Sequence, residues 1–160
     1  MGTAFSADIR VQSGMFDATA ETARLTQGRT DIGAVVGFTG LCRDEGGRLA
    51  ALELEHYPGM AEIQIGRIAT EAAARWPLCG LLVIHRHGVI AAGEPIVLVA
   101  ATSTHRQASF DAASFVMDFL KTRAPFWKRE HLVDGSLGDW VAASADDDAA
   151  EARWTTFTPR

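Results

Sequence analysis

Residues 120–130 read LKTRAPFWKRE and hold the only two lysines of the chain, Lys121 and Lys128, on either side of Pro125. All other basic side chains, histidine apart, are arginines. Arginine stays protonated, whereas a lysine in a partly desolvated pocket can release its proton and act as a base or a nucleophile. The segment therefore suggests a site that needs a titratable amine, although an arginine-biased composition with two chance lysines explains the count equally well.

Pro125 also separates two kinds of local structure. Apolar positions before it repeat with helical spacing, which predicts a helix that is capped by Ser103 or Thr104 and runs to about Arg123. Pro125 cannot continue a helix, and residues 126–130 are predicted to be extended, so the two lysines can approach each other only through the tertiary structure. The apolar stripe of the predicted helix consists of Ala112, Val116, Phe119 and Leu120.

The start of this helix is a candidate anion site. His105 and Arg106 are predicted to lie in its first turn. Unpaired backbone N–H groups at a helix start attract anions, and two cationic side chains add to that field. A bound phosphate and an ordinary solvated helix start both remain open interpretations.

The rest of the chain mixes strands and helices. Two nearly continuous apolar runs, 81–84 and 96–101, are typical of strands buried on both faces, so we expect them at the centre of a sheet, with residues 88–95 turning between them. Further strands are predicted at 8–12, 33–39 and 50–56. This order, with hairpins between strands, predicts the α+β class rather than a doubly wound parallel sheet.

A second long helix is predicted between Pro58 and Pro77, because proline suits the first turn of a helix and stops a helix further along. The apolar side chains expected to face the sheet are Met60, Ile63, Ile68, Ala72 and Trp76.

Composition limits the classes of function. The chain has 160 residues and a formal net charge of −5, which predicts one domain and disfavours nonspecific binding to nucleic acid or to an anionic membrane. No apolar run approaches the roughly 20 residues of a membrane span, and no basic-then-hydrophobic leader begins the chain. Cys42 and Cys79 lie far apart, so we expect free thiols in a reduced, cytoplasmic setting.

His85 and His87 lie two positions apart on a predicted strand and would share a face, as two ligands of a metal ion must. No third ligand is evident in the sequence. We therefore favour structural roles for both histidines and predict no metal site.

Several segments of the chain, taken together and in order, are recognisable: VVGFTGLCRD, LELEHYPGM, RWPL, VIHRHG, TSTHR, FVMDFLKTRAPFWKRE and the closing ARW. They resemble the catalytic large subunit family of molybdopterin synthase. The resemblance runs from about Gly33 to Trp154, and all 160 residues are expected to form a single domain, with the residues before Gly33 and residues 155–160 outside the similarity.

The resemblance implies an α/β hammerhead fold with an additional small antiparallel β-sheet. It implies a homodimer that binds one small ubiquitin-like sulfur-carrier subunit at each end, which makes a heterotetramer. The implied reaction moves two sulfur atoms from the carrier's C-terminal thiocarboxylate to cyclic pyranopterin monophosphate and forms the dithiolene of molybdopterin. No metal or other cofactor takes part in this step.

The resemblance also implies a set of site residues. Lys121 and Lys128 match the family's catalytic lysines, and we hypothesise that Lys121 is the main acid/base or covalent-contact group while Lys128 orients and neutralises the substrate. The pocket is expected to be built partly across the dimer. Its remaining members match Arg43, His105 and Arg106 as substrate-binding cations and Phe38 and Met117 as lining residues.

Two other classes of function stay open on the sequence. One is a non-catalytic dimeric binding module, in which the lysines only pair with the terminal carboxylate of a ubiquitin-like partner. The other is an enzyme of different chemistry that uses the same basic pocket for a phosphate ligand. The chain departs from the family's pattern in two places: the loop 43–48 is short, and residues 134–140, DGSLGDW, lack an arginine before Trp140. Both departures are expected to affect the rim of the pocket or the docking of the carrier.

Overall fold

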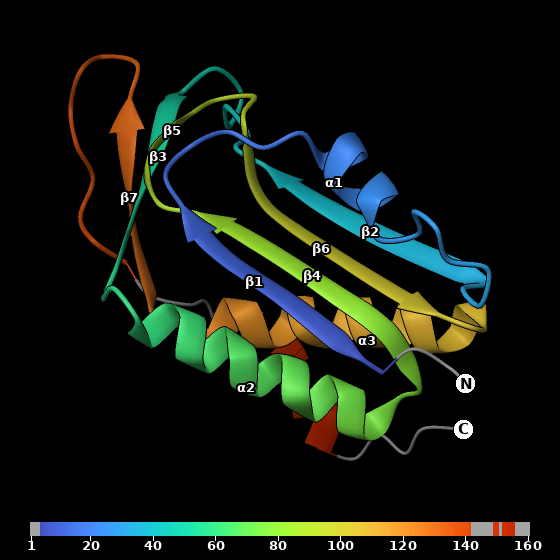
Figure 1. The fold of residues 1–160 in the computed structure, drawn as a ribbon. Helices are drawn as coiled ribbons and strands as arrows, with labels where there is room; N and C mark the ends of the chain where they lie inside the picture. Colours follow the sequence, from blue (N-terminus) through green and yellow to red (C-terminus); the bar gives the residue numbers. More distant parts are fainter. Residues whose placement is uncertain (1–3, 142–148, 151, 156–160) are drawn as a thin grey trace.

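The computed structural model describes residues 4–141, 149–150 and 152–155. Its centre is a mixed four-stranded sheet in the order β1-β4-β6-β2 (Figure 1). β1 pairs with β4 in parallel, whereas β6 is antiparallel to both β4 and β2. The strands are β1 (Ser6–Gln12), β2 (Ala34–Leu41), β4 (Leu78–Arg86) and β6 (Pro95–Ser103).

Helices cover both faces of this sheet: α2 (Met60–Arg75) and α3 (Arg106–Thr122) lie on one face and α1 (Ala18–Arg24) lies on the other (Figure 1). Side chains alternate across a strand, and Leu81 and Val83 of β4 accordingly pack with α2 and α3, while Leu82 and Ile84 pack on the side of α1. All four side chains are at most 1% exposed. The prediction of two central strands buried on both faces is confirmed for β4 and β6.

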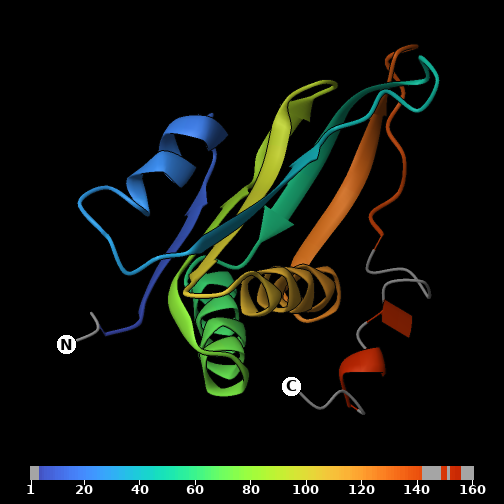
Figure 2. The same cartoon turned by 90° about the vertical axis from the view of Figure 1, so that its right-hand side faces the viewer.

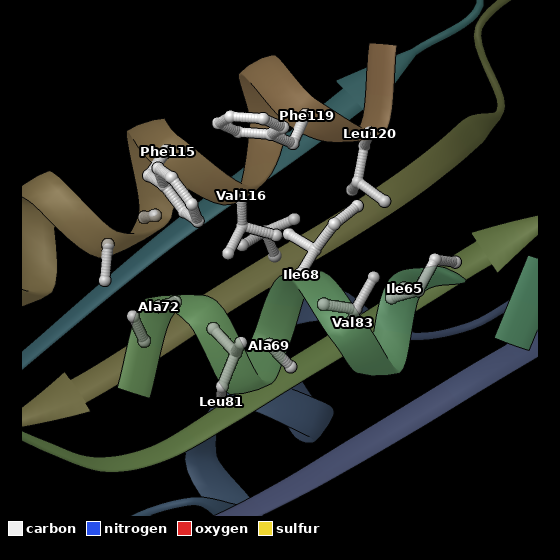
Figure 3. Packing of buried hydrophobic residues seen from close by; sticks show 14 of the residues in the cluster. Ile65, Ile68, Ala69, Ala72, Leu81, Val83, Phe115, Val116, Phe119 and Leu120 are labelled. Carbon is white, nitrogen blue, oxygen red and sulfur yellow. The ribbon is translucent and has the colours of Figure 1, made fainter. Parts of the chain in front are cut away.

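Helices α2 and α3 pack on each other and on the sheet through one apolar core (Figure 3). The ring of Phe115 lies 4.5 Å from that of Phe119 and 5.2 Å from that of Trp76, centroid to centroid. The small side chain of Ala72, fully buried, lets the helices approach closely. This core fixes the direction of α3, whose last turn carries Lys121.

The predicted core face of α2 is partly wrong. Met60 and Ile63 are 52% and 59% exposed. The buried stripe instead begins at Ala61 and continues through Ile65. The prediction missed it because alanine gives a weak apolar signal, so the larger side chains of Met60 and Ile63 were assigned to the buried face. Ile68, Ala72 and Trp76 are buried as predicted.

The start of α3 also differs from the prediction. The N-cap residue is His105, no side chain caps the helix, and Arg106 is the first helical residue. Ser103 lies two residues before the N-cap, where its hydroxyl donates a hydrogen bond to the carbonyl oxygen of Pro77 at 2.8 Å and accepts one from the N–H of His105 at 3.4 Å. His105 and Arg106 are therefore both exposed beside uncapped backbone N–H groups.

A second, three-stranded antiparallel sheet in the order β5-β3-β7 stands beside the first sheet (Figure 2). The prediction of a simple turn over residues 88–95 is wrong, because Ile90 is fully buried in β5. The strand β5 is short and flanked by glycines, so its sequence gives a weak strand signal. The strands of this second sheet are β3 (Leu49–His56), β5 (Gly88–Ala91) and β7 (Phe126–Leu132).

Two sheets with these three helices confirm the expected α+β class and the additional small antiparallel sheet. A short 3₁₀ helix, η1 (Arg153–Thr155), is tied to α3, because Asp118 Oδ2 accepts hydrogen bonds from Trp154 Nε1 and Arg153 Nη2, each at 2.6 Å. Within the described ranges, no helix is long and apolar enough to cross a membrane.

Candidate active site

A pocket lies at the seam between the two sheets, next to the C-terminal end of α3. Strands β2, β4 and β6 contribute to it from the first sheet, and β3 and β7 from the second. Its cavity volume of about 180 Å³ is less than the roughly 300–1,000 Å³ of pockets that enclose a whole drug-sized ligand. Much of the wall is apolar, including Leu52, Leu54, Ile96, Val97 and Leu120.

Lys121 and Lys128 both line this pocket. Lys121 lies in the last turn of α3, and the chain then turns tightly at Pro125, where the N–H of Phe126 donates to the carbonyl oxygen of Ala124 at 2.8 Å. Side chains alternate along β7, so Phe126 and Lys128 lie on the same face and both reach the pocket. A helix end and a strand start thus bring the chain's two lysines together.

The two lysine side chains differ from the neighbouring arginines in having no ion-pair partner among the residues that the structure describes. Lys121 is exposed at the pocket mouth and Lys128 is half-buried. This chain alone does not desolvate the amine of Lys121. The neighbouring arginines are paired, Arg123 with Glu71 at 3.2 Å, Arg129 with Glu53 at 2.7 Å and Arg48 with Glu130 at 2.7 Å.

His85 on β4 adds an imidazole to the pocket. Its Nδ1 lies 2.9 Å from the carbonyl oxygen of Arg86, which can only accept, so Nδ1 carries the proton. The ring stacks on Phe126, with centroids 3.9 Å apart and planes inclined by 14°. Burial is the main cause that lowers the pKa of His85 to about 4, and the charge of Lys121 acts in the same direction. At neutral pH the imidazole is therefore neutral.

The other histidines of this region pack against aromatic rings. The rings of His56 and His87 lie 4.4 Å apart, and His56 also stacks on Phe126 at 5.8 Å. Burial, followed by the neighbouring His56, lowers the pKa of His87. No group of three or more His, Cys, Asp or Glu side chains in the described part of the chain could hold a metal ion, and we assign no ligand role to His85 or His87.

The predicted site residues fall into two groups in this chain. Phe38 and Met117 line the pocket with the lysines, and Phe38 is 44% exposed at its rim.

Arg43, His105 and Arg106 do not line it. Arg43 lies between β2 and β3 and pairs with Glu45 at 3.0 Å. His105 and Arg106 lie at the opposite end of α3, about 22 Å from Lys121 along the helix axis at 1.5 Å per residue.

Sequence reasoning missed three features of the pocket. The sequence analysis weighs His85 as a metal ligand or a structural residue but not as a pocket residue, although its place directly after the buried run LLVI was the available signal. Phe126 has no site role in the sequence analysis, yet it forms pocket wall. Gly40 was not considered, and a Cβ atom there would lie 2.8 Å from Val97 Cγ1, so a larger residue would crowd the pocket.

Comparison with known proteins adds evidence of relationship. The family model of the MoaE protein matches residues 11–123. A molybdopterin synthase catalytic subunit from Mesorhizobium japonicum is 64% identical over 154 residues, which cover 96% of this chain and 97% of that protein.

Solved structures agree with this relationship. The molybdopterin biosynthesis MoaE protein from Burkholderia ambifaria has a TM-score of 0.81 and 45% identity, covering 95% of this chain and 100% of that one. A complex of subunits 1 and 2 of molybdopterin-converting factor from Helicobacter pylori matches with a TM-score of 0.67 over 86% of this chain and 90% of that chain. At 18% identity, that match supports the fold alone.

Proposed function

This chain belongs to the MoaE protein family, whose members include molybdopterin synthase catalytic subunits, and from that premise we propose the reaction at its pocket. The chain transfers sulfur from the C-terminal thiocarboxylate of a small ubiquitin-like carrier to cyclic pyranopterin monophosphate and so forms the dithiolene of molybdopterin. The observation that carries the proposal is the seam pocket, which gathers both lysines of the chain. The reaction takes place in the cytoplasm.

The chemistry of sulfur transfer calls for an amine at this place. The thiocarboxylate sulfur first attacks a side-chain carbon of the pterin, the carbon–oxygen bond at that carbon breaks and its oxygen substituent leaves, so that carrier and pterin are joined as a thioester. Water then adds to the thioester carbonyl carbon, the bond from that carbon to sulfur breaks, the carrier leaves with a terminal carboxylate and the sulfur stays on the pterin. A neutral amine can accept the proton of the attacking water, and an ammonium can stabilise the oxyanion that forms on the carbonyl.

The different surroundings of the two lysines support different roles. Lys121 is exposed at the mouth of the pocket, where an entering carrier tail would meet it and exclude water, so we assign it the acid/base or covalent-contact role. Lys128 is half-buried in the wall and suits a fixed cation that orients and neutralises the substrate. Both amines are available to a ligand because the nearby carboxylates are paired with arginines.

We further propose that a homodimer completes the site and that two carriers make the assembly a heterotetramer. One chain offers a small, open cavity with Phe38 exposed at its rim. His105 and Arg106 stand exposed at the uncapped start of α3, which suits a phosphate, but far from the lysines of their own chain. A second copy would supply these two cations, together with Arg43, to the pocket of the first.

The direct test incubates the protein with thiocarboxylated carrier and cyclic pyranopterin monophosphate and measures the dithiolene product. We expect Lys121→Ala and Lys121→Arg both to abolish product while still binding the carrier, since arginine keeps the charge but cannot release its proton. Arg67→Ala, which removes an exposed cation on α2, is the matched control and should keep wild-type turnover. Near-normal turnover by Lys121→Arg would refute the acid/base role, and carrier binding without product by the wild type would indicate a binding module.

A mixed-dimer experiment tests the shared site. Lys121→Ala and Arg106→Ala are each expected to be inactive as homodimers. If the cations act across the dimer, a mixed dimer of the two variants contains one site with both residues intact and regains about half of the wild-type activity per dimer. No recovery in the mixed dimer would place both residues in a site of one chain.

A further inference from the structure

The pocket has an unequal supply of hydrogen-bonding side chains. Lys121 and Lys128 carry ammonium groups, which only donate when protonated. Apart from the weak thioether of Met117, His85 has the one neutral acceptor among the lining side chains that the structure describes. A ligand that presents N–H donors to this pocket therefore has a single strong side-chain acceptor to meet.

The acceptor atom of His85 is fixed by the hydrogen bond on the other ring nitrogen. Because Nδ1 carries its proton toward the carbonyl oxygen of Arg86, the neutral ring holds its lone pair on Nε2. No residue within the described ranges forms a hydrogen bond with Nε2. The structure thus leaves this lone pair for a ligand.

The ring of His85 is also held in place. Phe126 stacks on it at 3.9 Å, and His56 lies on Phe126 in turn, with His87 beside His56 at 4.4 Å. Lys121, His56 and His87 are the titratable groups that face His85, and each disfavours its protonation. A rigid, neutral acceptor next to two cations is an arrangement that can select among anionic ligands.

We propose that His85 is a specificity-determining residue, whose Nε2 accepts a hydrogen bond from an N–H group of the pterin ring. The inference rests on the proposed function and deepens it by assigning recognition of the substrate's charge and recognition of its hydrogen-bond donors to different side chains. The lysines attract any phosphate ester, whereas the imidazole accepts from a heterocycle that carries N–H donors. A site built around such a bond discriminates strongly against a ligand that covers the acceptor without donating to it, since the polar group is then left unpaired.

The test compares two substitutions with opposite hydrogen-bonding properties. His85→Phe keeps an aromatic ring on Phe126 but removes the acceptor, and His85→Gln gives up the ring but can place an amide oxygen near the former Nε2. We expect His85→Phe to raise the KM for the pterin about tenfold or more while the KM for the carrier stays within about twofold, and His85→Gln to recover most of the loss. An unchanged pterin KM in His85→Phe, or equal impairment of both variants, would overturn the proposal.

A second measurement needs neither turnover nor a variant. The ¹⁵N resonance of His85 Nε2 in the wild-type protein should shift when the pterin is added and stay unchanged when inorganic phosphate is added. An unchanged ¹⁵N resonance of His85 Nε2 after addition of the pterin would overturn the role of His85. Absence of product from the wild type together with a shifted resonance would instead refute the proposed reaction and leave the binding role of His85 standing.

Discussion

Acidification should destabilise this protein through His85, and the size of the effect follows from the structure. The imidazole has an ordinary pKa of 6.5, and in the folded chain burial lowers the pKa of His85 to about 4. Between these values the unfolded chain binds a proton that the folded chain does not, so the free energy of unfolding falls as the pH falls. The full difference corresponds to about 3 kcal/mol, of which about 2 kcal/mol is lost by pH 5.

The assay is urea unfolding of the wild type and of His85→Phe at about pH 7.5 and about pH 5. Phenylalanine has no proton to bind, so the variant should lose about 2 kcal/mol less than the wild type over this range. The missing hydrogen bond to Arg86 lowers the variant's stability equally at both pH values and cancels in the comparison.

Other groups also respond to acid. Ion pairing with Arg10 lowers the pKa of Glu21, and pairing with Arg129 lowers that of Glu53. These carboxylates lose their contribution as the pH falls, but they do so in both proteins. Identical pH dependence of the two unfolding free energies would therefore refute a buried, neutral His85.

Two further predictions concern packing. Phe115→Ala should lower the free energy of unfolding by about 3–5 kcal/mol in a urea titration, because the ring is fully buried against Trp76 and Phe119. As the control, Phe110→Ala removes a ring that is 58% exposed and should lower it by less than about 0.5 kcal/mol in the same titration. Gly40→Ala places a Cβ atom 2.8 Å from Val97 Cγ1, so calorimetry should show stability reduced by about 1–3 kcal/mol and weaker binding of the pterin. Wild-type stability and affinity would contradict this account of the pocket wall.

Local patterns were enough to predict most of the fold. The apolar runs in β4 and β6 identified two central strands, since a strand covered by helices on both faces cannot alternate with polar residues. Pro125 marked where α3 must end and an extended segment begins. Two of the predictions that failed, the phase of α2 and the strand β5, fell where alanine or glycine gave a weak local signal.

The site could be predicted only in part from the residues. The two lysines stood out because they are the only ones in the chain. His85 did not stand out, because its neutral state comes from burial by residues distant in sequence, and its stacking partner Phe126 arrives only when the two sheets meet. The resemblance named Arg43, His105 and Arg106, and their place outside this chain's pocket became visible only in three dimensions.

The sequence by itself determined most of the helices and strands and where the unusual amines lie, because helix and strand periods and the proline break act over a few neighbouring residues. The tertiary structure alone decided that β7 pairs with β3, which places Lys128 opposite Leu54. It also decided that these two strands line one pocket together with His85 and the end of α3. The pocket depends on contacts between residues more than seventy positions apart, as Leu54 and Lys128 are. No local pattern carries that information, because such contacts form only when separate elements bury their apolar faces together.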